Sequence, residues 1–180
     1  MREIILNNKI FEPFILEDEI NQIVSNLAEK INQSKIVDPL FIAVLNGSFL
    51  FAADMMRKIS LEDAEISFIK LSSYSGTEST GEINKLIGIN NDISGRNIIL
   101  LEDIIDTGST LENVVSMLQK LQVSDIKIAT LLFKPKAYKK SLSIDYIGKE
   151  ISNDFVVGYG LDYDEIGRNL PHIYKLKKQK

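Results

Sequence analysis

The sequence contains no cysteine, a single histidine and no excess of positive charge. Without cysteine the chain cannot form disulfides, thiolate metal sites or a cysteine nucleophile. Its formal net charge of −4 gives no broad basic surface for nucleic acid, so a bound phosphate must be held by a local site or through a metal ion. The one histidine, His172, has no acidic or metal-ligating partner evident in the sequence, and we interpret it as structural.

Long apolar runs are also missing. No segment approaches the ~20 residues that a membrane-spanning helix needs, and the first 14 residues lack the apolar core of a secretion signal. We therefore expect no membrane association and a cytoplasmic location. The 180 residues, of which 44% are hydrophobic and 26% charged, are enough to bury a core and fit one domain.

Apolar runs alternate with segments of helical periodicity. Strands are predicted at residues 40–45, 65–73, 97–101, 126–133, 144–147 and 155–159, and helices at residues 17–34, 49–59 and 111–121. This alternation predicts an α/β fold with a parallel sheet. The polar stretch 74–82, with two glycines and five hydroxyl residues, is interpreted either as a mobile lid or as a long hairpin connection.

The segment after strand 97–101 is rich in groups that bind phosphate. In open α/β sheets, ligands bind beyond the carboxyl ends of the strands. Gly108 allows a tight turn there, hydroxyls come from Thr107, Ser109 and Thr110, and the following helix start supplies free N–H groups. Together they predict a phosphate cradle. Taken alone, Ser109 or Thr110 would be better explained as an ordinary helix N-cap.

Three acids, Glu102, Asp103 and Asp106, crowd the same loop and would repel a phosphate unless each has another task. Ionised carboxylates only accept hydrogen bonds, and a vicinal diol donates two, so Glu102 and Asp103 could hold the hydroxyls of a ribose. Magnesium could offset the remaining charge, which leaves Asp106 for proton transfer. A solvated acidic turn is the alternative interpretation.

The segment ILLEDIIDTGSTL closely resembles the signature loop of the type I phosphoribosyltransferases, which use 5-phosphoribosyl-1-diphosphate (PRPP). No Walker A motif is present. Further segments are similar, in order, to the hypoxanthine–guanine members of that family: LNGSFLFAAD at 45–54, SYSGTESTGE at 73–82, LFK at 132–134 and DFVVGYGLDY at 154–163. The matches span roughly residues 40–170.

The resemblance implies the type I phosphoribosyltransferase fold: one domain over residues 1–180, with a central, mostly parallel sheet flanked by helices. A small hood would come from the N-terminal segment and about 150–180, and a flexible lid from about 74–82. The implied activity is purine salvage, in which PRPP and hypoxanthine or guanine give IMP or GMP and pyrophosphate. Mg²⁺ would be the cofactor, and a homodimer or homotetramer the assembly.

The resemblance also implies roles for the sugar and phosphate residues. Glu102 and Asp103 bind the ribose diol directly or through magnesium. The 5′-phosphate is held by the four residues Thr107, Gly108, Ser109 and Thr110. The pyrophosphate is met by Asn46, Gly47 and Arg168. The family often has a basic residue where this chain has Asn46, whose backbone N–H can still serve, although a basic side chain's role there is put in doubt.

For the base, the resemblance implies that Asp106 exchanges a proton with purine N7 and that Lys134 donates to O6. Phe155 stacks on the ring and the Val156 backbone reads its edge. Asp162 would help bind a second magnesium ion and could offer its carbonyl to a guanine amino group. Ser73 and Tyr74 would close over the reaction.

Without the resemblance these side chains have plainer interpretations. Lys134 would be a surface lysine, Phe155 and Val156 core residues, and Arg168 half of a surface ion pair. Two other functions also remain open: a regulatory protein that binds PRPP or nucleotide, and a transferase for another base. Lys134 disfavours adenine, whereas xanthine differs from hypoxanthine at C2, where contacts are mostly made by backbone.

Overall fold

The structure is a computed structural model that describes residues 2–72, 84–87, 89 and 92–178; the predicted lid, with Ser73 and Tyr74, lies outside these residues. The described helices are α1 (Glu17–Gln33), α2 (Phe49–Met56) and α3 (Ser109–Lys120). The described strands are β1 (Ile4–Leu6), β2 (Lys9–Ile15), β3 (Pro39–Val44), β4 (Glu65–Ser72), β5 (Asn84–Ile87), β6 (Asn97–Ile105), β7 (Asp125–Phe133), β8 (Tyr146–Glu150), β9 (Val156–Val157) and β10 (Ile173–Leu176). None of the described helices has the combination of length and hydropathy that a membrane span requires.

The main sheet has the strand order β5-β4-β3-β6-β7-β8. Strands β4, β3, β6, β7 and β8 run parallel to one another, and β5 pairs antiparallel with β4. The predicted α/β fold with a mostly parallel sheet is therefore confirmed. Several predicted boundaries differ from the structure, and the difference that bears on the site is at the end of β6. This strand continues to Ile105, so that Glu102 and Asp103 are strand residues rather than loop residues.

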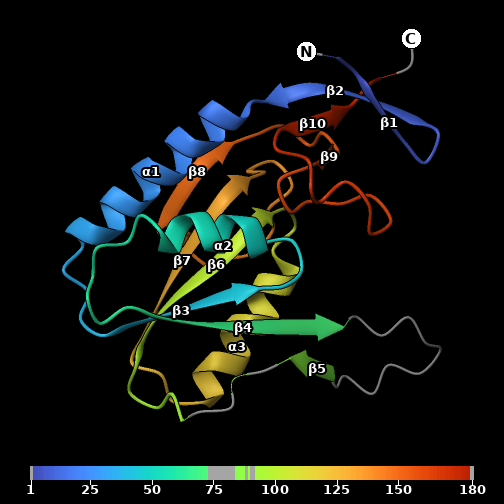
Figure 1. The fold of residues 1–180 in the computed structure, drawn as a ribbon. Coiled ribbons are helices and arrows are strands. Elements are labelled where there is room, and N and C mark those ends of the chain that lie inside the picture. Colours follow the sequence, from blue (N-terminus) through green and yellow to red (C-terminus); the bar gives the residue numbers. More distant parts are fainter. Residues whose placement is uncertain (1, 73–83, 88, 90–91, 179–180) are drawn as a thin grey trace.

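Helices cover both faces of the main sheet (Figure 1). All six residues of β3 are buried, as expected for a strand covered on both sides. On one face, α1 and α2 pack with side chains that include Phe41, Ala43, Ile99 and Leu101. On the other face, α3 packs with their sequence neighbours Leu40, Ile42, Ile98 and Leu100. The alternation along β3 and β6 thus divides the core into two layers.

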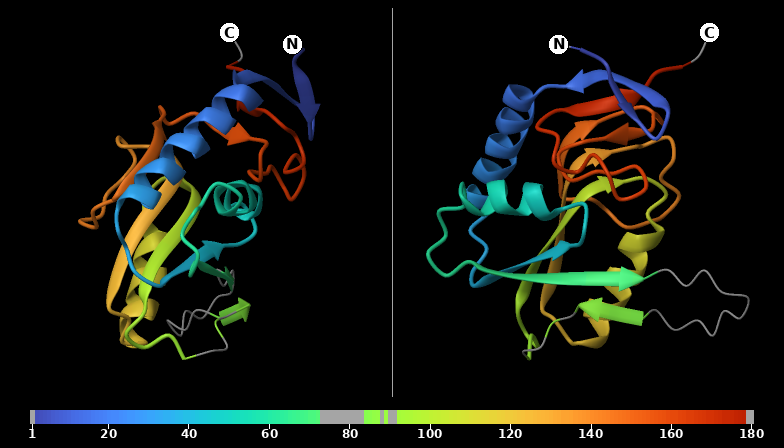
Figure 2. Two further views of the ribbon diagram at one scale, coloured as in Figure 1. Left: turned by 60° about the vertical axis from the view of Figure 1, so that its left-hand side comes forward. Right: turned by 45° about the vertical axis from the view of Figure 1, so that its right-hand side comes forward.

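A second, antiparallel sheet joins the two ends of the chain. Its strand order is β1-β2-β10-β9, and β10 pairs with both β2 and β9. Figure 2 shows this hood sheet beyond the carboxyl ends of β6, β7 and β8. Residues that follow those strands therefore lie between the main sheet and the hood sheet.

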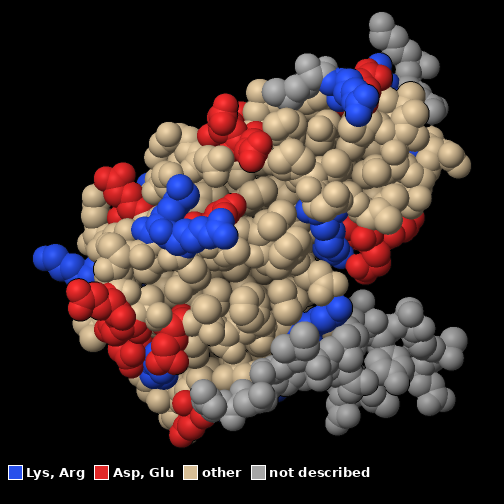
Figure 3. Space-filling view, in the orientation of Figure 1, with Lys and Arg blue, Asp and Glu red and all other residues tan. Residues whose placement is uncertain are grey.

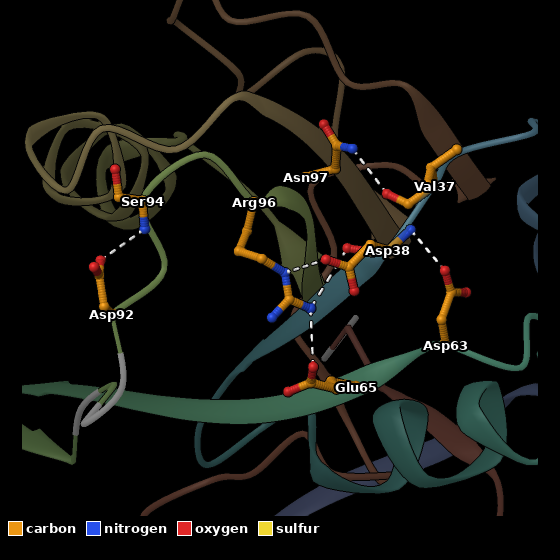
Figure 4. Close-up of polar contacts among 8 residues, drawn as sticks. All are labelled: Val37, Asp38, Asp63, Glu65, Asp92, Ser94, Arg96 and Asn97. Atoms are coloured by element: carbon orange, nitrogen blue, oxygen red, sulfur yellow. Dashed lines mark hydrogen bonds and ion pairs between the residues drawn. The ribbon is translucent and has the colours of Figure 1, made fainter.

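At the amino-terminal ends of the main-sheet strands, Arg96, just before β6, links neighbouring segments through ion pairs (Figure 4). Its guanidinium forms ion pairs with Asp38, 3.0 Å from Nε, and with Glu65, 3.1 Å from Nη2. The Nε contact is an ion pair without hydrogen-bond geometry. Asp63 accepts a 2.9 Å hydrogen bond from the Asp38 N–H. These contacts join the segment before β3 to β4 and β6, far from the carboxyl ends.

Candidate active site

A hollow of about 100 Å³ opens where β6 ends and α3 begins, and Glu102 and residues 104–111 line it. Gly108 has a φ of 84°, a left-handed conformation that glycine adopts readily, and no side chain caps the helix start. Thr107 Oγ1 and Ser109 Oγ lie 3.3 Å apart beside it. The first N–H groups of α3 and these hydroxyls can therefore meet an anion. The structure brings together the four residues predicted to hold the 5′-phosphate.

Two residues that sequence reasoning missed cover the outside of this loop. A methyl group at Gly108 would collide with the Tyr138 ring and with the aliphatic part of Lys140. Tyr138 also packs edge-on against Phe133, with ring centroids 5.4 Å apart. No spacing in the sequence indicated these contacts, because they depend on how the segment after β7 folds back over Gly108.

The acids Glu102 and Asp103 point to opposite sides of β6, because successive strand residues alternate. Glu102 lines the hollow at the start of α3, whereas Asp103 contacts Gly47 in the loop between β3 and α2. Both residues are buried, with exposed fractions of 6% and 9%. A ribose diol held by both acids would therefore have to span the end of β6.

Burial makes both acids hard to ionise. It raises the pKa of Glu102 well above its ordinary value, and the charge of Asp103 raises it further. Burial also raises the pKa of Asp103 to about 6, although backbone hydrogen bonds, such as the one from the Ile104 N–H, and the charge of Arg168 act to lower it. Each carboxylate would be stabilised by a cation or by hydroxyl donors.

Three segments meet at Gly47. A methyl group at Gly47 would overlap the Asp103 carboxylate, and a methyl group at Gly160 would overlap the Gly47 carbonyl oxygen. The Asp103 side chain at the end of β6 thus packs on the loop 45–48, and the backbone of that loop packs directly on the loop after β9. Asn46 lies in this stack, half-buried, after a cis peptide bond.

Arg168 is held by the loop after β9. Its Nη1 donates to the Gly160 carbonyl at 2.9 Å, and the Gly160 N–H donates to the Arg168 carbonyl at 2.9 Å. Its Nη2 forms ion pairs with Asp162 at 2.9 Å and Glu165 at 3.1 Å. Arg168 and Asp162 both influence the pKa of Asp103, so the predicted pyrophosphate and metal residues share one electrostatic neighbourhood.

Lys134 and Asp106 contact each other directly. Lys134 follows β7, is only 7% exposed, and places Nζ 2.7 Å from Asp106 Oδ2. Its own N–H donates to the Ile105 carbonyl at 3.0 Å, which fixes the backbone beside the end of β6. Lys134 is therefore not a surface lysine. The side chain of Asp106 is 49% exposed, so this ion pair borders the open part of the site.

An aromatic group stands at the hood side of the site. Phe155 is 43% exposed, and its ring meets Tyr163 edge-on at 5.6 Å and Phe11 at 6.2 Å between centroids. Lys9 Nζ lies 4.7 Å from the centroid of Tyr163. Val156, in β9, is buried. An exposed ring supported by other rings can stack on a planar ligand.

No three or more histidine, aspartate or glutamate side chains of the described chain converge as a metal site would require. Among the described residues no basic side chain forms an ion pair with Glu102 or Asp103, so either buried carboxylate fits a magnesium ion, which commonly takes one or two carboxylates plus substrate phosphates. On the face shown in Figure 3, basic and acidic side chains alternate in small mixed groups, which agrees with the net charge of −4.

The mostly parallel sheet, in which β6 leads through the turn at Gly108 into α3, and the separate hood sheet together define the class of protein. The chain belongs to the phosphoribosyl transferase family, whose domain model matches residues 15–164. The resemblance identified in the sequence is thereby confirmed.

More specifically, the chain is similar to hypoxanthine-guanine phosphoribosyltransferases. The protein of that name from Staphylococcus aureus is 37% identical over 176 residues, which cover 97% of this chain and 98% of the relative. Its Staphylococcus epidermidis counterpart is 40% identical over 165 residues, 91% of this chain and 92% of that protein. A Bacillus anthracis hypoxanthine-guanine phosphoribosyltransferase crystal structure, with HEPES in the active site, superimposes with a TM-score of 0.84 at 40% identity, covering 92% and 98% of the two chains.

Proposed function

We propose that this chain transfers the 5-phosphoribosyl group of PRPP to hypoxanthine and guanine, giving IMP or GMP and pyrophosphate. The observation that supports this most directly is the Lys134–Asp106 pair, with an ammonium and a carboxylate 2.7 Å apart. A 6-oxopurine carries O6 and N7 side by side on one edge. Lys134 can only donate, which suits O6, and ionised Asp106 can only accept, which suits an N7–H group.

The two side chains then have distinct tasks. As the purine enters, the contact between Lys134 and Asp106 is replaced by two contacts with the base, one from each side chain. As N9 bonds to C1 of the ribose and the bond from C1 to pyrophosphate breaks, Asp106 accepts the proton that leaves N7. Phe155 stacks on the ring and the Val156 backbone meets its edge, while Asp162 could offer its carbonyl to the amino group of guanine.

The remaining site residues hold PRPP. Thr107, Gly108, Ser109 and Thr110 bind the 5′-phosphate in the hollow at the start of α3. Glu102 and Asp103 meet the ribose diol from the two sides of β6. Asn46 and Gly47 offer backbone N–H groups to the pyrophosphate, and Arg168 offers its guanidinium. Ser73 and Tyr74 keep their proposed role of closing over the reaction.

Magnesium fits the acids of this site. Glu102 and Asp103, on the two sides of β6, would meet one ion through the ribose hydroxyls and other substrate oxygens, and Asp162 would help to hold a second. When bound, Mg²⁺ neutralises charge on the leaving pyrophosphate and fixes its geometry.

We also propose that the chain forms a homodimer or homotetramer. Phe49 at the start of α2 and Ile66 and Phe68 on β4 are 39%, 36% and 37% exposed. Strand alternation places both β4 side chains opposite to buried Ile69, on the face of the sheet that α2 covers. Light scattering tests this: wild type should exceed the 20.3 kDa chain mass, and Phe68→Glu should shift it towards that mass.

The enzyme proposal is tested by mixing purified protein with PRPP, Mg²⁺ and each purine base and measuring nucleotide formation by absorbance. We expect IMP from hypoxanthine and GMP from guanine, dependent on Mg²⁺. Protein that binds PRPP but forms no nucleotide with any base would instead be a PRPP-binding regulator. Preferential formation of xanthosine monophosphate would identify a xanthine transferase.

A further inference from the structure

A buried tyrosine links the loop after β9 to helix α2. Tyr159 is 6% exposed, and its side chain packs in the core layer under α1 and α2. Its hydroxyl donates a 2.7 Å hydrogen bond to Oδ2 of Asp54. Tyr159 has a φ of 50°, in the left-handed region that side chains rarely adopt. Such a conformation persists only where the surrounding contacts hold it in place.

This hydrogen bond joins the two segments that we propose meet the pyrophosphate. Asp54 lies on α2, which begins directly after the loop 45–48. Tyr159 directly precedes Gly160, which exchanges two hydrogen bonds with Arg168. Between the segments themselves, backbone packs on backbone at Gly47 and Gly160. Such a contact has no interlocking side chains to resist sliding, whereas a directional hydrogen bond does.

The hydroxyl of Tyr159 is well suited to a permanent link. Burial, and then the hydrogen bond to Asp54, raises the pKa of Tyr159, so the group remains a donor throughout the neutral range. Asp54 also pairs through Oδ1 with Arg57 at 3.3 Å, which leaves Oδ2 to accept from the tyrosine.

We propose that Tyr159 and Asp54 are positioning residues that fix the distance between the Gly47 loop and Arg168, and hence the geometry of the pyrophosphate site. This inference rests on the proposed function. It also predicts that loss of the hydrogen bond affects PRPP and pyrophosphate binding more than base binding, because the base-binding side of the loop is held separately. Val156 and Val157 pair with β10 through the hood sheet, and that pairing does not involve the tyrosine hydroxyl.

The test compares steady-state constants in four variants. Tyr159→Phe removes only the hydroxyl, and Asp54→Leu removes the acceptor. Asp54→Asn keeps an oxygen that can accept the bond. Tyr174→Phe is the matched control, since it removes a hydroxyl from another buried tyrosine, 7% exposed, in the hood sheet.

We expect Tyr159→Phe and Asp54→Leu to raise KM for PRPP, and for pyrophosphate in the reverse reaction, by about tenfold, because small displacements of binding groups are costly. KM for hypoxanthine should change less than about twofold, since the base side is held by the β9–β10 pairing. Asp54→Asn and Tyr174→Phe should remain close to wild type. The double variant Tyr159→Phe/Asp54→Leu should be no worse than either single change, as expected for one shared interaction.

Equal increases in the KM values of both substrates would overturn the inference, as would a lower Tm with unchanged kinetics, because either result describes a purely structural tyrosine. Should Tyr159→Phe fail to fold, the contrast between Asp54→Leu and Asp54→Asn decides the question alone. Wild-type protein that forms no nucleotide would overturn the proposed function and this inference together. Active wild type with unaffected variants would overturn this inference alone, so the two failures can be distinguished.

Discussion

Asp103, which we propose meets the ribose of PRPP, is expected to lower the stability of the ligand-free protein at neutral pH. Its carboxyl is buried, and burial raises its pKa from 3.8 to about 6. Between these values the folded protein keeps a proton that the unfolded chain has lost, so the contribution of this group to stability falls as pH rises from about 4 to about 6. At ~1.36 kcal/mol per pKa unit, the loss is on the order of 3 kcal/mol.

We therefore predict that Asp103→Asn is more stable than wild type without ligand at pH 7 to 8, by about 1–3 kcal/mol. The two proteins should converge near pH 4, where the wild-type carboxyl is protonated. Urea unfolding across this pH range measures the difference, and PRPP binding should be weakened in the same variant. Asp125→Asn, at a half-exposed surface acid, serves as the control. A stability difference independent of pH would contradict the titration argument.

Lys134 leads to a prediction about specificity. Hypoxanthine and guanine accept at O6, whereas adenine has an amino group there, and a lysine ammonium has no acceptor to offer it. An unpaired buried polar group costs roughly 1–3 kcal/mol, and more when charged. Since ~1.4 kcal/mol is a factor of ten, kcat/KM should favour hypoxanthine over adenine by at least ~10²-fold.

We expect Lys134→Gln to lower kcat/KM for hypoxanthine and to narrow this ratio, because an amide can present a donor or an acceptor. Kinetics with both bases measures the effect, and Lys136→Gln, at an exposed lysine two residues on, is the control. An unchanged ratio in Lys134→Gln would mean that another group reads C6.

Among the helices and strands, the sequence predicted those that have a periodic or apolar pattern within their own residues. The periodicity of residues 17–34 predicted α1, and the apolar runs predicted β3 and β7 within a residue. The end of β6 was predicted too early, because acids are uncommon in buried strands and Glu102 and Asp103 looked like loop residues. Their burial depends on the hood sheet and the Gly47 loop, which come from distant parts of the chain. That long-range packing has no local sequence signal.

The start of α1 shows another long-range contact. No side chain of the adjacent residues caps this helix, and the Glu17 N–H instead donates to Nδ1 of His172 at 3.1 Å. His172 directly precedes β10 and therefore ties the helix to the hood sheet. The sequence alone could not identify the partner of His172, because Glu17 is 155 residues away along the chain.

We predict that His172→Ala destabilises the protein by about 1 kcal/mol, the typical effect of losing a helix cap. His172→Asn should retain most of the stability, because its side-chain oxygen can accept from the same N–H. Thermal unfolding of the two variants beside wild type measures this, with an expected Tm decrease of about 2–4 °C for alanine. Equal Tm values for alanine and wild type would show that water satisfies the Glu17 N–H equally well.

At the scale of the whole molecule, the site is assembled from chain segments that are far apart. The signature segment of residues 102–110 was recognised from sequence because its residues are contiguous. The contacts of Gly47 with Asp103 and Gly160 were not predictable, because glycine in a loop has many explanations. The pairing of Lys134 with Asp106 required the register of β6 and β7, where Ile105 lies opposite Phe133.

Because the site joins the main sheet to the hood sheet, its ligands should stabilise the whole chain. The buried acids Glu102 and Asp103 are the groups most stabilised by a cation, but no three such side chains of the described chain converge on one point. Mg²⁺ alone should therefore bind weakly, and PRPP oxygens should complete its coordination.

We accordingly predict that Mg²⁺ alone changes Tm by less than about 2 °C, whereas Mg²⁺ with PRPP at 100 times its Kd adds ~2.7 kcal/mol, or about 5–10 °C. Ribose 5-phosphate with Mg²⁺ is the matched control, because it fills the phosphate hollow but has no pyrophosphate to reach Arg168 and the Gly47 loop. Its effect on Tm should lie between the two. If Mg²⁺ alone produced the full increase, the acids would form a complete metal site by themselves, and PRPP would not be the ligand that joins the two sheets.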